Sequence, residues 1–514
     1  MTQFYNSSAP TTKNPPSGVP ATASLALDSQ TRIGPINYHP IQDQFIGPPG
    51  KLRLKDKNEK IWVTKQGQLI RKDKGQFYDV GRIDARGNFE FNTGFKGNAF
   101  NNAYFRIASA FMQGPLGEKL RKYDMDQAKA ASEINYIRQN LTQHGIDGRG
   151  SQVYCFEMAD LDKDGYLNPS SHIRAVKGTV DQAYAPGSTA TLVGFTARDF
   201  EEKDDVAYWF EQTQKSMVDD NIAISQAIDN IITQKKPGEP TIINMSMGNT
   251  LTSLVSGMYH QLDAKFSNGT YFRPKMRDFF YGPNATNLTD TQKYNILFKK
   301  LKPWYDTNPT IQRSLQQYLT TTEKAAKNNV FITVSAANDH TLFPTGVHVP
   351  AGAEFNQLAM SPHVIAVAAS NNNGTPGHYG DDRVSHFSSR GDGARYNPDI
   401  AATGENVFLG QYHFFGVPSG AFDGTSFSGP LTAATLAMMC QVNPNLTPPQ
   451  AKQLLKQACS QNNTDLASAG TGIMDPVKAV RLSQVLYAQQ PVNHYSPYPA
   501  APAHYLPPAF NHQM

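Results

Sequence analysis

Cysteine is scarce in this chain of 514 residues, which contains only Cys155, Cys440 and Cys459. Each lies within an apolar or helical pattern, so we expect buried free thiols instead of a disulfide framework. No run of 18 apolar residues occurs, and no transmembrane helix is therefore predicted. The first residues lack a charged stretch followed by an apolar one, so we expect no cleavable signal peptide. These absences favour a cytoplasmic location, or secretion without a cleaved signal.

The net charge is also small, because 47 Lys and Arg residues face 43 Asp and Glu residues. A formal charge of +4 gives no indication of a nucleic-acid partner. Residues 51–74 are more basic, with nine Lys or Arg against three Asp or Glu. That stretch is either a solvated face or a contact for an anionic partner such as a membrane surface.

The amino-acid composition changes along the chain. Residues 1–50 are rich in Pro, Ser, Thr, Asn and Gly, and the tail at 487–514 is rich in Pro, Tyr and His, so both are expected to be disordered. Residues 51–144 begin with alternating polar and apolar residues between glycine turns and continue with a helical pattern over 100–143. We therefore predict a small N-terminal module of β-hairpins and a helix, which is a candidate propeptide.

From residue 145 to residue 486, short apolar runs alternate with helical patterns, one of them at 219–236. Such runs are typical of strands buried on both faces of a parallel sheet. The alternation predicts an α/β fold with a doubly wound, mostly parallel sheet. The expected strands are residues 153–156, 191–195, 241–247, 330–337, 364–370 and 399–404.

The strongest local motif is GTSFSGP at residues 424–430, which leads into an apolar helical run. Gly424 permits a sharp turn, and the helix start that follows favours negative charge developing near Ser426. Taken alone, a serine at this place is equally typical of a simple helix cap. The motif resembles the serine block, GTS-x-x-x-P, of the subtilisin-like (subtilase) family.

The resemblance extends over about residues 145–486 and rests on several blocks in the family's order. It implies a three-layer subtilisin-like fold. It also implies a serine endopeptidase that hydrolyses peptide bonds of a protein or peptide substrate through an acyl-enzyme and requires no cofactor. The blocks are GIDGRGSQVYCFE (145–157), SSHIRAVKGTV (170–180), INMSMG (243–248), ITVSAAND (332–339), core segments at 364–404 and two closing helices.

The resemblance assigns a role to each chemical group. Ser426 is the expected nucleophile and His172 the base that takes its proton and returns it to the leaving amine. Glu157 is the expected carboxylate that orients the imidazole, and Asn338 the donor to the tetrahedral oxyanion.

The segment Ser246-Met247-Gly248 resembles the family's substrate-binding strand. An extended substrate is expected to add beside it as a further strand, through main-chain hydrogen bonds. The sequence predicts neither which protein is cut nor the oligomeric state of the chain.

Three positions near the chemistry depart from the family pattern. Glu157 stands where the family has Asp, Ile173 follows His172 where the family has Gly, and Ala337 replaces the Gly before Asn338. The change at Ala337 is expected to alter the primary specificity pocket. An alternative is therefore a weak or inactive pseudoprotease that serves as a protein-binding module. Retention of the serine, histidine, carboxylate and asparagine favours the enzyme, because a binding module has no physical reason to keep all four.

Two further features lie outside these blocks. Asp160, Asp162 and Asp164 precede Gly165 with a spacing that suits calcium, but Ser171 replaces the bidentate Glu of an EF-hand, and a solvated acidic turn fits equally. An aromatic-rich insertion at about 250–310 is either a lid or partner-docking surface, or a small satellite core.

Overall fold

The computed structural model describes most of the chain from residue 133 onward and the backbone of a group of strands before it. The described ranges are 133–158, 172–195, 203–266, 269–283, 285–373, 375–407, 422–460 and 464–490, with strand backbone within 51–91 and 413–418.

Strands within residues 51–91 form an antiparallel sheet in the order β1-β2-β3-β4-β5. Each strand pairs with the next along the chain, as the predicted hairpins require. Of the helix predicted over 100–143, the described part is helical at residues 133–140. The strands are β1 (Lys51–Arg53), β2 (Lys60–Val63), β3 (Gln68–Asp73), β4 (Gln76–Ile83) and β5 (Phe89–Phe91).

The central sheet runs in the order β15-β16-β12-β10-β9-β8-β6-β7, with β11 paired to β10. The pairs from β7 across to β12, and the β12–β16 pair, are parallel. The mostly parallel sheet predicted from the apolar runs is thus confirmed. Its strands are β6 (Gln152–Met158), β7 (Thr189–Phe195), β8 (Thr241–Met245), β9 (Val330–Ser335), β10 (Ile365–Asn371), β11 (Arg383–Val384), β12 (Ile400–Thr403), β15 (Cys459–Ser460) and β16 (Ile473–Met474).

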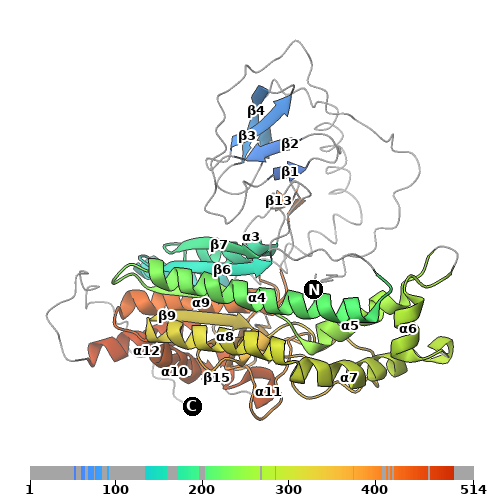
Figure 1. Ribbon diagram of the computed structural model, residues 1–514. Helices are drawn as coiled ribbons and strands as arrows, with labels where there is room; N and C mark the ends of the chain where they lie inside the picture. The colour runs from blue at the N-terminus through green and yellow to red at the C-terminus, as the bar shows by residue number, and fades with distance from the viewer. Residues whose placement is uncertain are drawn as a thin grey trace.

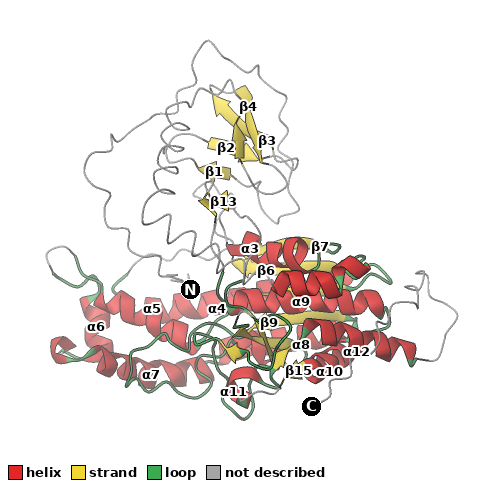
Figure 2. Ribbon diagram, turned by 180° about the vertical axis from the view of Figure 1, so that it is seen from behind, coloured by secondary structure: helices red, strands yellow, loops and turns green. Residues whose placement is uncertain are grey.

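Helices cover both faces of this sheet and make three layers. Successive strand residues face opposite ways, so Ile242 belongs to one hydrophobic cluster and Ile243 to the other. One face packs on α4 (Val206–Gln234) and α8 (Pro309–Lys327), which lie in front of the sheet in Figure 1. The other packs on α9 (Thr425–Val442), α10 (Pro448–Ala458) and α12 (Pro476–Ala488), which lie in front in Figure 2.

The long insertion between β8 and β9 folds as helices α5 (Leu251–Asp263), α6 (Pro274–Tyr281) and α7 (Asp290–Thr307), which extend from one end of the layers (Figure 1). Their buried side chains form a separate cluster with Trp209 and Met217 of α4. This cluster explains why α4 begins well before the predicted helix at 219–236. The insertion therefore contains the satellite core that its aromatic content suggested.

Within the described part of the chain, the three cysteines are buried and unpaired, as expected. None of the helices in the described ranges combines the length and apolar character that a membrane span requires.

Candidate active site

Ser426 is the second residue of α9, and the turn before it depends on two glycines. Gly424 has a φ of 151°, a backbone conformation that favours glycine. Gly429 lies so close to the sheet that an added Cβ would stand 2.9 Å from Asn244 Oδ1 and 3.1 Å from Ser335 Oγ. The glycines therefore bring the first turn of α9 directly onto the carboxyl ends of β8 and β9, with Ser426 largely buried.

Asn338 follows β9 and is bonded to the start of α9. Its Oδ1 accepts hydrogen bonds from the Thr425 backbone N–H at 2.8 Å and from Thr425 Oγ1 at 2.9 Å. Because a backbone N–H can only donate, the acceptor must be the oxygen of the amide, which fixes the Nδ2 side as the donor. Nδ2 would lie 3.4 Å from a Cβ built on Gly424, so it is beside the turn that carries Ser426.

Ala337, the departure from the family pattern before Asn338, has a φ of 90°. A side chain is strained in this conformation, which glycine adopts freely. The carbonyl of Ala337 accepts from the Ser389 N–H at 2.9 Å, which holds the strained backbone in place. The chain therefore keeps the backbone shape of the glycine pattern while carrying an extra methyl group.

Glu157 and His172 are joined by a hydrogen bond. Glu157 lies near the end of β6 and is buried, and His172 is the first residue of α3 (His172–Gly178). The distance between Glu157 Oε2 and His172 Nδ1 is 3.0 Å, and Glu157 Oε1 accepts from the Met158 N–H at 2.9 Å. A carboxylate only accepts, so Nδ1 is the protonated nitrogen and Nε2 is left as the base.

Two opposing effects act on the pKa of His172. Desolvation lowers it, and the charge of Glu157 and the hydrogen bond to it raise it, with a net direction above the usual value. The imidazole is nonetheless 46% exposed, so it can meet a substrate. Its ring meets Phe427, the residue after Ser426, edge-on at a centroid distance of 5.6 Å. The histidine therefore lies beside the first turn of the serine helix.

Ile173, the departure from the family pattern after His172, does not project into the solvent beside the histidine. Its side chain is fully buried in the core cluster that also contains Val176 of α3 and Leu431 of α9. Ile173 thus helps to pack α3 against the serine helix.

The predicted substrate strand, Ser246-Met247-Gly248, is bonded to the serine helix α9 and is linked to the end of β9. Ser246 Oγ donates to the Ser426 carbonyl at 3.1 Å and accepts from Asn244 Nδ2 at 2.9 Å. Asn356, which the sequence reasoning missed, donates through Nδ2 to the carbonyls of Met247 at 3.0 Å and Ser335 at 2.8 Å. Asn356 therefore links the substrate strand at Met247 to the end of β9, which is followed by Asn338.

Asp339 is a second residue that the sequence reasoning missed, although its place directly after Asn338 is a signal that could have found it. Its Oδ2 accepts hydrogen bonds from the hydroxyls of Thr250, Thr252 and Ser253. The first residues of α5 are thereby tied to the oxyanion segment. Asp339 is a positioning residue for this side of the site.

The candidate calcium ligands Asp160, Asp162 and Asp164 lie outside the described residues. Elsewhere in the described ranges, no group of three or more His, Cys, Asp or Glu side chains is arranged to hold a metal ion. Calcium binding at the three aspartates stays a prediction.

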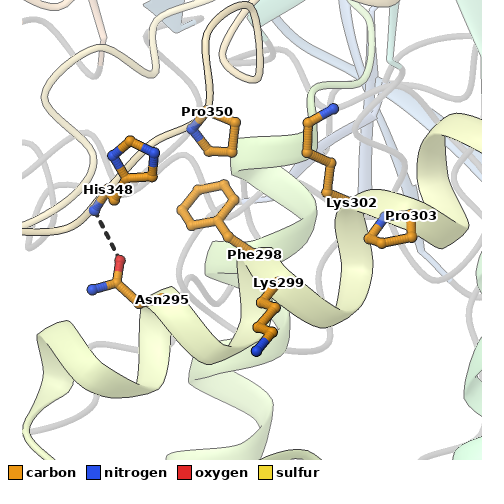
Figure 3. Close-up of a pocket in the computed structure, with 7 residues that line it drawn as sticks. All are labelled: Asn295, Phe298, Lys299, Lys302, Pro303, His348 and Pro350. Carbon is orange, nitrogen blue, oxygen red and sulfur yellow. Dashed lines mark hydrogen bonds between the residues drawn. The ribbon is translucent and has the colours of Figure 1, made fainter.

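A surface pocket of about 260 Å³ lies between α7 of the insertion and the segment at 348–350 that follows β9, and not at this site (Figure 3). The Phe298 ring stands between Pro350 and the α7 backbone, and Asn295 Oδ1 accepts from the His348 N–H at 2.8 Å. None of the lining residues belongs to β6, α3 or α9, which supply Glu157, His172 and Ser426. The lining residues are Asn295, Phe298, Lys299, Lys302, Pro303, His348 and Pro350.

Comparison with known proteins identifies the class. Residues 206–472, more than half of the chain, match the model of the subtilase family, peptidase S8. The chain therefore belongs to the subtilase family and is a serine-type peptidase, a hydrolase that acts on a protein or peptide substrate. The match covers Asn338 and Ser426 and begins after His172 and Glu157, so the base and its carboxylate rest on geometry.

One curated protein is similar to a short part of this chain. Serine protease AprX of Bacillus subtilis (strain 168) is 35% identical over 119 residues, which are 21% of this chain and 26% of that protein. The match thus spans about a quarter of that relative's length.

Solved structures share a more remote likeness. A mutant of the protease domain of PatA is 16% identical with a TM-score of 0.36, covering 66% of this chain and 96% of that one. MycP1 from the ESX-1 type VII secretion system is 14% identical with a TM-score of 0.37, covering 68% and 83%. These scores are too low to add to the assignment.

Proposed function

We propose that this chain is a serine endopeptidase that uses a variant triad of Glu157, His172 and Ser426, with Asn338 as oxyanion donor. The observation that carries the proposal is the 3.0 Å contact between Glu157 Oε2 and His172 Nδ1. This contact holds the imidazole with Nε2 unprotonated, which is the form that a serine hydroxyl requires in its base.

In this mechanism, Ser426 Oγ attacks the substrate carbonyl carbon while His172 Nε2 takes its proton. The negative charge of Glu157 stabilises the imidazolium that forms, in agreement with the raised pKa of His172. Asn338 Nδ2 and the start of α9 stabilise the oxyanion. The imidazolium then protonates the leaving amine, and water, deprotonated by the same histidine, hydrolyses the acyl-enzyme.

The peptidase domain proposed here spans residues 145–486, and the module at 51–144 is proposed as its propeptide. The experiment for this part is intact mass spectrometry of the purified chain. We expect self-cleavage between about residues 100 and 150 that the Ser426→Ala variant lacks. An active enzyme that keeps its whole N-terminal module would contradict the propeptide role.

Labelling by a fluorophosphonate, which reacts with activated serines, tests the catalytic proposal directly. We expect stoichiometric labelling of Ser426 in the chain lacking residues 1–132, which keeps the helix at 133–140 in the core, and in the chain after any self-cleavage. Ser426→Ala should abolish labelling. Ser428→Ala is the matched control, because Ser428 is a buried serine on the same helix whose hydroxyl donates to the Thr425 carbonyl. A folded sample that does not label would indicate a binding module without turnover.

A further inference from the structure

Three phenylalanines of the insertion are exposed, whereas the other aromatics around them are buried or half-buried. Phe266 is 50% exposed, Phe272 44% and Phe279 51%. In contrast, Phe280 and Tyr281 of the same helix α6 point into the satellite core. The three exposed rings are therefore not core residues, and the packing of the insertion does not account for them.

The exposed rings are held in a fixed arrangement by the backbone. Phe266 and Phe272 face each other across a short antiparallel turn, with their ring centroids 3.9 Å apart. The turn is closed by a bridge between Lys265 and Tyr271 and by a hydrogen bond from the Phe272 N–H to the Ala264 carbonyl at 3.0 Å. Phe272 is thus rigidly presented just before α6 begins at Pro274.

Three lysines lie near these rings. Lys265 precedes Phe266 in the sequence, and its Nζ lies 4.6 Å from the centroid of the Tyr271 ring. Lys275 lies four residues before Phe279, one turn away on the exposed face of α6. Lys300 of α7 reaches across to Phe279, with Nζ 5.0 Å from the ring centroid and 2.6 Å from the Phe279 carbonyl oxygen. All three lysines are exposed.

Two carboxylates offset part of this charge. Asp278 is the exposed carboxylate on α6 itself. Asp204 approaches the same helix and keeps its negative charge, because its two oxygens accept from the backbone N–H groups of Lys275 and Met276 at 2.9 Å. The surface formed by Phe266, Phe272, Phe279, Lys265, Lys275 and Lys300 is called here the aromatic–basic surface. Its three lysines outnumber the two neighbouring carboxylates, so the region keeps a small net positive charge.

The size of this surface distinguishes between partners. A phenylalanine buries about 150–250 Å² when fully covered, so three half-exposed rings offer roughly 300 Å². A stable protein interface needs about 800 Å² from each partner. A lipid surface requires less, because a few aromatic side chains enter the interface while cations attract anionic headgroups.

We propose that the aromatic–basic surface binds anionic lipid membranes. The rings of Phe266, Phe272 and Phe279 enter the interfacial region, and Lys265, Lys275 and Lys300 contact the headgroups. The proposal is independent of the catalytic assignment, since it involves no residue of the active site.

The test is co-sedimentation of the full chain, carrying Ser426→Ala to prevent self-cleavage, with phosphatidylcholine vesicles with or without phosphatidylglycerol. We expect binding that requires phosphatidylglycerol and weakens as salt is raised. Combined Phe266→Ser, Phe272→Ser and Phe279→Ser should weaken it at least about tenfold, given the apolar area removed. The matched control combines Leu342→Ser, Leu466→Ser and Val485→Ser, which are 39%, 54% and 48% exposed elsewhere, and should bind like the parent.

A second variant, Lys265→Glu with Lys275→Glu, keeps the three phenylalanines and the bond from Lys300 to the Phe279 carbonyl, and should also lose binding. All variants keep the basic stretch at 51–74, so that stretch cannot produce the differences. Binding that survives the triple phenylalanine change, equal binding to neutral vesicles, or no vesicle binding at all would overturn the proposal. So would a dimer in sedimentation velocity that the triple change dissolves, because a second copy would then be the occupant.

Discussion

The two halves of the active site are built from different kinds of contact. The serine half is buried and held by neutral hydrogen bonds. Asn338 and Ser246 bond to the start of α9, and Asn356 joins the segments that follow β8 and end β9. The histidine half joins β6 to α3 through one contact between ionisable groups, Glu157 and His172, with the imidazole half exposed.

This difference has a chemical reason. Nucleophile and oxyanion donor must keep fixed positions during the reaction, which redundant neutral bonds provide. The base must change its charge in each cycle, so its partner must respond to that charge. The serine half is therefore expected to be insensitive to pH, and the histidine half to depend on one carboxylate.

The largest effect should come from removing the charge of that carboxylate. Glu157→Gln is expected to lower kcat by about 10⁴-fold, as the equivalent Asp-to-Asn change does in a serine protease, because the imidazole would hold the wrong tautomer. Glu157→Asp should keep partial activity, since the charge remains. Turnover of one peptide substrate is the measurement, with Asp160→Asn as control. If Asp160→Asn is the damaging change, the third triad member is Asp160.

A smaller effect is expected in the serine half. Asn338→Ala should lower kcat by about 10²–10³-fold with little change in KM, the loss found on removing one such donor in subtilisin, a member of this family. Asn338→Asp keeps an acceptor for Thr425 and removes the Nδ2 donor. It should therefore be equally impaired. Recovery of activity in Asn338→Asp would mean that the residue only supports the start of α9.

The free energy of unfolding should also depend on pH where ionisable groups hold two elements together. The helix at 133–140 is fastened through Glu133, which is buried and whose Oε1 accepts from Tyr379 Oη at 2.6 Å. Burial raises the pKa of Glu133, the hydrogen bonds of Tyr379 and Asn372 lower it, and the charge of Asp475 raises it further. The net pKa is about 7. Burial and the charge of Glu133 raise the pKa of Asp382 to about 8.

Both folded-state values lie above the usual ones, so folding favours the protonated acids. Their contribution is complete below about pH 4 and is lost as pH rises through 7 and 8, on the order of 3 kcal/mol for Glu133. Urea unfolding of the Ser426→Ala chain should therefore show falling stability from pH 5 to pH 8. Glu133→Gln should flatten the slope, and Glu323→Gln, on exposed α8 surface, should not. A stability that stays level or rises in the parent contradicts this account.

The smallest effect concerns the strained backbone next to Asn338. Ala337→Gly should raise the free energy of unfolding by up to about 1 kcal/mol, since relief of the positive φ outweighs the added freedom of the unfolded chain. Ala336→Gly, at a buried neighbour without positive φ, should instead destabilise. Urea unfolding of both variants decides between strain and simple loss of packing.

Much of the fold could be predicted because buried parallel strands are apolar on both faces. The runs at 153–156 and 364–370 coincide with β6 and β10 to within two residues. The strand predicted at 241–247 is two residues too long, because β8 ends at Met245 and the next side chain, Ser246, donates to the Ser426 carbonyl of α9. Periodicity reports burial, and it carries no information on where a strand stops pairing.

The site could be predicted only in part, for a related reason. Ser426 and Asn338 stand in recognisable blocks, whereas Asn356 is defined by its bonds to Met247 and Ser335, which are far away in sequence. Nothing local marks such a residue. The exposure of Phe266 and its neighbours was equally hidden, since aromatic content alone fits a core or a surface.

The bonds of Asn356 and Asp339 have a consequence for how this enzyme can change over time. They join the carboxyl end of β8 and the start of α5, at Met247 and Thr250, to the carboxyl end of β9, at Ser335 and Asp339. The segment between is a closed loop, and lengthening a closed loop costs free energy only slowly. Substitutions and length changes in α5, α6 and α7 can therefore accumulate without moving the catalytic groups. New recognition surfaces can arise on the insertion while the chemistry stays constant.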